Sequence, residues 1–155
     1  MWSSLPLLES ILANWIPLSP SSRGLITLPQ SSHPTHDPPY TLDPLNTGSP
    51  QEAYMLSAPH QLHCLSTIMH SYGKLWNGAD ETHMAEHIAH CFDYLRQGIL
   101  CAGDVTVEGN ASWRFPDRKV EPPWGAEHMC RDWEGVREWA DEKGVWEFPD
   151  GLGIL

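Results

Sequence analysis

The sequence predicts a mainly α-helical fold: an antiparallel helical hairpin carrying two HxxHC motifs, a third C-terminal helix, long proline-rich loops and a small β element. Two observations predict this fold. The pattern HxxHC occurs twice, at residues 60–64 and 87–91, each time in a stretch with helical spacing of apolar residues. The link between the two copies is short, which favours neighbouring antiparallel helices. At 155 residues, the chain is expected to form a single domain over residues 1–155.

The N-terminal third is predicted to cover the hairpin rather than to carry chemistry. Residues 1–23 are largely apolar and are expected to form a cover segment with a short helix. Residues 24–29 are typical of a short strand. Residues 29–50 are rich in proline and are predicted to form an extended surface loop. We expect His33 and His36, which lie in that loop, to be solvated rather than to bind metal.

The helical hairpin is predicted over residues 57–100. Ser57 is a suitable N-cap, and the first helix is expected to end at Asn77. The second helix is expected to begin near Asp80 and to continue to about Leu100. Residues three apart share one helix face, so the two histidines of each motif point the same way. Antiparallel packing would then bring the two histidine faces together.

The C-terminal part is predicted to contain a strand and a third helix. Residues 104–108 alternate as a half-buried strand does. The third helix is predicted within residues 125–144, beginning near Glu127, because apolar residues recur there at helical spacing. Asn110 begins an Asn-Ala-Ser sequon and is a candidate N-glycosylation site if the chain enters a secretory lumen.

Charge and composition argue against several classes of function. Nine basic and twenty acidic residues give a net charge of −11 without a basic cluster, so nucleic acids and anionic membranes are poor partners. The N-terminal apolar run has no basic residue before Arg23 and is interrupted by polar residues, so we expect neither a signal peptide nor a transmembrane helix there. The chain has no GxSxG, P-loop or GxGxxG motif, so hydrolase, phosphoryl-transfer and nicotinamide chemistry lack support.

The repeated motif predicts a metal site with imidazole ligands. An all-nitrogen set suits copper or zinc, and iron is a further candidate. A lone histidine is more often a polar core residue or a solvated one, but burying four unpaired imidazoles would be costly. The metal ligands are therefore predicted to be His60, His63, His87 and His90.

Other polar residues near the motifs are candidates for supporting roles. Tyr94 and His83 are predicted to lie beside the metal and to act catalytically as proton relays. His70 and His128 are candidates for a further ligand or a substrate contact.

The four cysteines allow three disulfide pairings, and the sequence does not distinguish among them. Thiolate ligation to the metal is an alternative, but disulfides are the favoured interpretation in a secretory setting. The cysteines are Cys64, Cys91, Cys101 and Cys130.

Four stretches of the chain carry a family resemblance. They are His60-Gln-Leu-His-Cys64-Leu65, His87-Ile-Ala-His-Cys91-Phe-Asp-Tyr-Leu-Arg-Gln97, Cys101-Ala-Gly-Asp104 and the closing His128-Met-Cys-Arg-Asp-Trp133. Together they closely resemble the fungal UstYa-like proteins of mycotoxin biosynthesis. The resemblance runs from about Trp15 to Trp139.

The resemblance implies a copper-dependent oxidase or oxygenase of fungal secondary metabolism, with zinc or iron less favoured. The substrate would be a small molecule or a peptide, and the oxidant would be dioxygen or peroxide. The implied reactions are oxidative cyclisation, hydroxylation, desaturation or halogenation at a C–H or phenol group. The four motif histidines would be the metal ligands, and the four cysteines match the family cysteines, with disulfides expected. Family members usually carry an N-terminal transmembrane helix that places them in a secretory lumen or vesicle. This chain shows no such segment, so a lumenal or a cytoplasmic location stays open.

Two other functions are compatible with the same residues. One is a redox-neutral dehydratase or cyclase that uses the histidines as acid and base. The other is a non-catalytic, metal-stabilised binding module that supports another enzyme. A homodimer formed through an exposed apolar face is also compatible with the composition.

Overall fold

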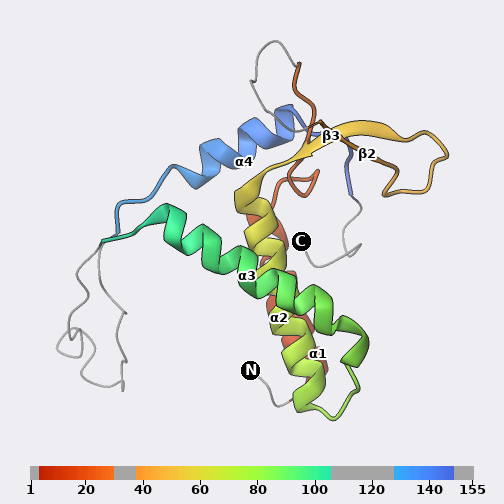
Figure 1. Cartoon of the computed structure of the whole chain (residues 1–155), viewed down its shortest axis with the longest axis vertical. Helices are drawn as coiled ribbons and strands as arrows, with labels where there is room; N and C mark the ends of the chain where they lie inside the picture. The colour runs from red at the N-terminus through yellow and green to blue at the C-terminus, as the bar shows by residue number, and fades with distance from the viewer. Residues whose placement is uncertain (1–3, 30–37, 106–127, 149–155) are drawn as a thin grey trace.

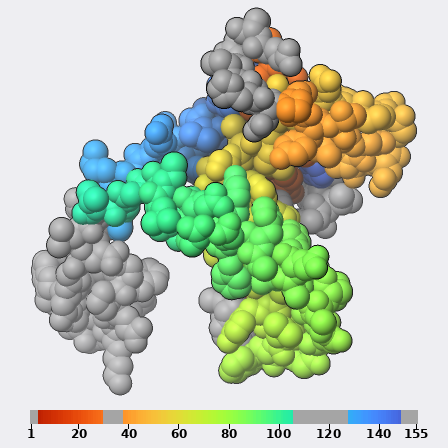
Figure 2. Space-filling view, viewed as in Figure 1, coloured from red at the N-terminus to blue at the C-terminus, as the bar shows by residue number. Residues whose placement is uncertain are grey.

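The computed structural model describes residues 4–29, 38–105 and 128–148. In these residues the fold is mainly helical with one small antiparallel sheet, which confirms the predicted fold class. Figure 1 shows α3 crossing over α2, α1 behind α2, and the sheet and α4 near the N-terminal end of α2. In the space-filling view, α3 forms the outer surface of the hairpin (Figure 2). The elements are α1 (Leu5–Ala13), η1 (Ile16–Leu18), β1 (Leu25–Ile26), β2 (Tyr40–Leu42), β3 (Gln51–Met55), α2 (Ser57–Trp76), η2 (Thr82–Met84), α3 (Ala85–Ala102) and α4 (Trp133–Glu142).

Helix α1 covers the back of α2. Its N-cap is Ser4, whose hydroxyl accepts a hydrogen bond from the Leu7 N–H (3.4 Å), and a proline lies in its first turn. Leu8 and Leu12 lie one turn apart on the same face, and each is only 1% exposed. The short N-terminal helix expected within residues 1–23 is therefore confirmed.

The sheet has the strand order β1-β3-β2, with both strand pairs antiparallel. Leu25 of β1 and Ala53 of β3 form a buried core with Trp146, which follows α4. The short strand predicted over residues 24–29 is confirmed. The prediction of an extended loop over residues 29–50 is wrong in part, because β2 lies within that range and pairs with β3. A strand of three residues is too short to show the alternation by which strands are recognised.

Helix α2 begins one residue earlier than predicted. Leu56, rather than Ser57, is the N-cap residue, and no side chain caps the helix. The Leu56 N–H donates to the Gly24 carbonyl (2.9 Å), which ties the start of α2 to β1. Gly24 has a φ of +85°, and a Cβ there would lie 2.6 Å from the Pro59 Cβ. Glycine is thus required where the sheet approaches the first turn of α2.

The hairpin link explains where the two long helices end and begin. Helix α2 ends at Trp76 with Asn77 as its C-cap, as predicted. Helix α3 begins later than the predicted Asp80, because that carboxylate accepts from the Thr82 N–H (2.9 Å) in the turn before η2. The buried carboxylate of Glu81 accepts from the Ser71 hydroxyl (3.0 Å), which holds the link against α2.

Helix α4 is shorter than the helix predicted to begin near Glu127. Residues 128–132 are not helical, and the Asp132 side chain is the N-cap, accepting from the Gly135 N–H (3.2 Å). The apolar side chain of Met129, which suggested an earlier start, is fully exposed. Most of the strand predicted over residues 104–108 lies outside the described residues, as does Asn110.

Candidate metal centre

The α2–α3 hairpin brings the four motif histidines together. Across the two helices, the ring centroids of His60 and His90 lie 5.7 Å apart, and those of His63 and His87 lie 5.9 Å apart. Along the helices the spacings are 6.3 Å within α2 and 6.5 Å within α3. The four rings therefore form a four-sided cluster with one cross-helix pair at each end.

The two sides of this histidine cluster differ in exposure. His60 and His63 on α2 are half-buried, whereas His87 and His90 on α3 are exposed. Burial lowers the pKa of His60 below its ordinary value of 6.5, and the neighbouring imidazoles of the cluster lower it further. The neutral imidazole is the form that binds a metal, so this environment favours ligation by His60.

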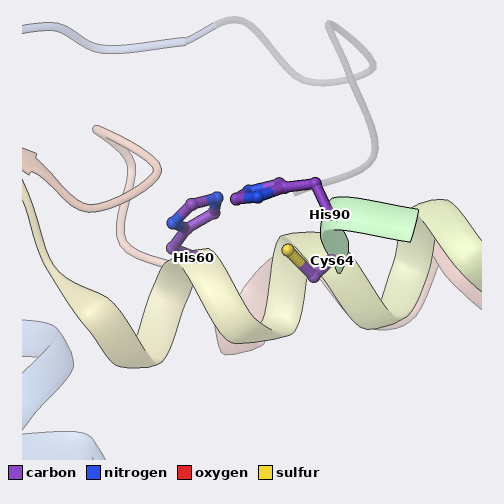
Figure 3. Close-up of side chains that lie close together, drawn as sticks. All are labelled: His60, Cys64 and His90. Atoms are coloured by element: carbon purple, nitrogen blue, oxygen red, sulfur yellow. The ribbon is translucent and has the colours of Figure 1, made fainter. Parts of the chain in front are cut away.

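Cys64 lies beside the cluster, at the first turn beyond His60. Potential ligand atoms of His60, Cys64 and His90 all lie within 4.8 Å of one another. Figure 3 shows the two imidazoles facing each other, with the Cys64 sulfur on the same side of α2. Burial, together with the adjacent Cys91 thiol, raises the pKa of Cys64 to about 12. In the metal-free protein Cys64 is therefore a neutral thiol, whereas the thiolate is the form of cysteine that binds a metal.

Tyr94 lies at the edge of the cluster. Its ring centroid is 4.3 Å from that of His60 and 5.8 Å from that of His90. Its hydroxyl donates to the Ser57 Oγ (3.1 Å) at the start of α2. The structure thus places this candidate proton relay next to the candidate ligands.

The other candidate histidines lie elsewhere. His83 is in η2 at the hairpin link, where its charged neighbours are Asp80 and Glu81. In the described part of the chain, no ring contact joins His70 or His83 to the four clustered imidazoles. His128 lies beyond the C-terminal end of α3, and its Nδ1 is 2.5 Å from the Asp104 carboxylate. The structure does not bring it to the cluster.

All four cysteines are free thiols in the structure, which differs from the disulfides expected from the sequence. Cys64 and Cys91 are fully buried and adjacent, each next to the last histidine of its motif. Cys101 and Cys130 are exposed and flank the contact between Asp104 and His128. The geometry therefore groups the cysteines as one buried pair and one exposed pair.

Sequence reasoning missed two residues at this site, Ser57 and Gln61. Gln61 Nε2 donates to the Ser57 Oγ (3.0 Å), the same oxygen to which Tyr94 donates. The signal was available in the spacing, because residues four apart on a helix can bond to each other. The partner on α3 was not visible without the fold.

Comparison with known proteins places the chain in a family. The family model described as "Mycotoxin biosynthesis protein UstYa" matches residues 9–143. The chain belongs to the UstYa family. The oxidase ustYb of Aspergillus flavus is 32% identical to this UstYa-family chain over 162 residues, covering 87% of the chain and 58% of that protein. The oxidase ustYa of the same organism is 31% identical over 128 residues, covering 83% of the chain and 57% of that protein.

A third relative is named for a different activity. The hydroxylase cctR of Talaromyces islandicus is 35% identical over 95 residues, covering 59% of this chain and 34% of that protein. The chain thus spans little more than half the length of the two oxidases that it matches. No solved structure matches it. Within the described residues, no helix combines the length and the apolar character needed to cross a membrane.

Proposed function

We propose that this UstYa-family chain binds copper through His60, His63, His87 and His90 and catalyses an oxidation in fungal secondary-metabolite biosynthesis. The observation that carries the proposal is the assembly of both motif histidine pairs into one cluster at the α2–α3 crossing. The family membership and the oxidase and hydroxylase names of relatives support an oxidative role.

The donor set suits copper. Imidazole nitrogen is a good ligand for copper, and among the described residues the group of ligand atoms at His60, Cys64 and His90 includes no carboxylate. The two cross-helix pairs are compatible with one ion held by four nitrogens or with one ion at each pair. Zinc is a less favoured occupant, because the relatives' names point to redox chemistry, which zinc does not support. Iron is less favoured because non-haem iron oxygenases typically hold the metal with two histidines and a carboxylate, and the ligand group found among the described residues contains no carboxylate.

The chain's own residues would then set where the chemistry happens. Bound copper would supply the one-electron chemistry through which dioxygen or peroxide oxidises a C–H or phenol group. The exposed His87 and His90 leave the α3 side open to a substrate, whereas α1 closes the back of α2. Tyr94 can move a proton at its hydroxyl, through the bond to the Ser57 Oγ.

The family and the exposed cluster support a proposal for the substrate class. We propose a peptide or a small molecule that undergoes cyclisation, hydroxylation, desaturation or halogenation. An open cluster can accept one group of a large substrate while the remainder stays in solvent, so a peptide side chain is compatible with the geometry.

The test is metal analysis of the protein before and after reconstitution with copper. We expect copper to bind and to give an electron paramagnetic resonance spectrum with nitrogen hyperfine structure. His63→Ala and His90→Ala should each abolish loading and turnover, because each removes one half of a cross-helix pair. His83→Ala is the matched control and should load copper as the wild type does, since it lies at the hairpin link. Full activity in His63→Ala or His90→Ala would overturn the assignment.

Two other outcomes would replace the proposal. Turnover that survives a strong chelator without oxygen would favour a redox-neutral enzyme in which the histidines act as acid and base. Tightly bound zinc, with unfolding on its removal and no substrate consumed, would favour a metal-stabilised binding module.

A further inference from the structure

A small polar network joins the two helices at one edge of the histidine cluster. The Ser57 Oγ accepts one hydrogen bond from Gln61 Nε2 (3.0 Å) and another from the Tyr94 hydroxyl (3.1 Å). A serine oxygen has two lone pairs, so these two donors use its full accepting capacity. The first two residues belong to α2 and the third to α3, so the network fixes the helices relative to each other at this point.

Gly98 on α3 makes room for this network. A Cβ at Gly98 would lie 2.5 Å from both the Cδ and the Oε1 of Gln61, closer than any real contact allows. Gly98 lies inside α3 and has no positive φ, so backbone conformation does not require glycine here. Glycine inside a helix is less favourable than alanine. A side chain at position 98 would therefore have to displace the Gln61 amide, which is the flexible end of its side chain, from this place against α3.

The network acts on the cluster through Tyr94. The Tyr94 ring lies 4.3 Å from the ring of His60, with the two planes tilted by 37°. The imidazole of His60 has no hydrogen-bond partner in the described part of the chain. A metal-binding imidazole is usually oriented by a hydrogen bond that its second ring N–H donates. For His60, packing against Tyr94 takes the place of that bond.

We propose that Ser57, Gln61 and Gly98 are positioning residues, which hold Tyr94 against His60 and so fix how that imidazole faces the metal. The orienting role of these residues rests on the copper function proposed above. The contacts themselves, which we call the Tyr94 network, are a property of the metal-free protein. The proposal assigns a role to Gln61, the residue that follows the first histidine of the motif and is not a candidate ligand. It also assigns a role to Gly98, which lies one turn beyond Tyr94.

The first experiment uses the metal-free protein with isotope-labelled histidine. The ring current of Tyr94 should shift the His60 ring proton in the wild-type NMR spectrum, and Gln61→Leu and Gly98→Ala should each remove most of that shift. Tyr94→Phe keeps the ring but loses the hydroxyl bond that ties it directly to Ser57, so it should reduce the shift at least as much. The matched control is Gln97→Leu. The Gln97 Nε2 donates to the carboxylate of Asp93, four positions earlier on α3 (2.7 Å), just as Gln61 donates to a residue four positions earlier on α2. That control should leave the His60 signal unchanged.

The second experiment uses the copper-loaded protein. Gln61→Leu and Gly98→Ala should change the nitrogen hyperfine pattern and weaken copper binding about tenfold, as is usual when a ligand loses its orienting partner. Gln97→Leu should match the wild type in both. Because alanine favours a helix more than glycine does, a loss in Gly98→Ala does not come from helix propensity.

The two proposals fail in different ways. A wild-type protein that binds no copper would overturn the proposed function. The His60 signal of the metal-free protein would still test whether the Tyr94 network holds Tyr94 against His60. A His60 signal that stays unchanged in both Gln61→Leu and Gly98→Ala would overturn the positioning role of these residues, whether or not the protein binds copper.

Discussion

The two HxxHC copies are alike in sequence and unlike in surroundings. The copy on α2 is half-buried, and α1 packs behind it with Leu8 and Leu12. The copy on α3 has exposed histidines, and apolar side chains on the rest of that helix are also exposed, with Phe92 at 60% and Ile99 at 72%. A repeated motif therefore does not make a symmetric site. One copy supplies the fixed wall of the candidate metal centre and the other supplies its open side.

The largest expected contrast is between the buried thiol of the first copy, Cys64, and the exposed thiols Cys101 and Cys130. With a pKa of about 12 in place of the ordinary 9.0, Cys64 should present about a thousandfold less reactive thiolate at a given pH than an ordinary cysteine. Exposed Cys101 and Cys130 should be alkylated quickly in the reduced native protein. Peptide mapping by mass spectrometry after a short alkylation measures the three rates. If Cys64 were labelled as fast as Cys101, the Cys64 side chain would be accessible to solvent, and the first motif copy would not be buried as described.

The same mapping on oxidised protein tests the disulfide hypothesis. Because Cys64 and Cys91 are adjacent, we expect oxidation in a lumen-like redox buffer to join the two motif copies to each other. Cys101 and Cys130 should form the other pair, across the contact between Asp104 and His128. A bridge from Cys64 to Cys101 would contradict this grouping.

Removing the support behind the first copy should give the next largest effect. Leu12→Ala should lower the free energy of unfolding by about 3 kcal/mol, because it leaves a cavity where a fully buried leucine packs between α1 and α2. Leu7→Ala on the same helix is the control. Leu7 is 44% exposed, so its loss should stay within about 0.5 kcal/mol. Urea unfolding of the metal-free variants makes the measurement, and equal losses would mean that α1 does not anchor α2.

An element of this fold could be predicted where the pattern that indicates it lies within one short stretch of the sequence. The two motif helices and the meeting of their histidine faces follow from the spacing within each motif and the short link. The start of α4 was misplaced because Met129 continues the apolar spacing, whereas the cap at Asp132 decides the boundary. Strand β2 was missed because its pairing with β3 is a contact between separate segments, which no local pattern records.

The site shows the same division. The ligand candidates could be named from the sequence, but their unequal exposure could not, because it depends on how α1 packs against α2 in the folded chain. The same holds for Gln61 and Gly98, which lie on different helices and meet only in the folded chain. His83 was expected to lie beside the metal, but it lies in η2, before α3 begins.

A smaller effect is expected from pH, through His60. Because its pKa is lowered in the folded chain, the unfolded chain binds the His60 proton more readily. The resulting loss of stability is absent above the ordinary value of 6.5, grows as the pH falls from 6.5 toward the lowered pKa, and is complete below it. Urea unfolding of the metal-free protein should show this decline, and His60→Gln should make it shallower. An identical decline in the variant would mean that His60 is not the group responsible.

The smallest effect is expected on the outer face of α3, where the comparison of the two copies is most easily overturned. Phe92 is 60% exposed and follows the second motif directly, so Phe92→Ala should change the free energy of unfolding by no more than about 0.5 kcal/mol. The measurement should be made at two protein concentrations, because a homodimer that covers this face would make stability depend on concentration. A concentration-dependent loss in the wild type that disappears in Phe92→Ala would mean that a second copy covers the outer face of α3. The copy on α3 would then be supported from behind as the copy on α2 is, and the two motifs would differ only in which partner supports them.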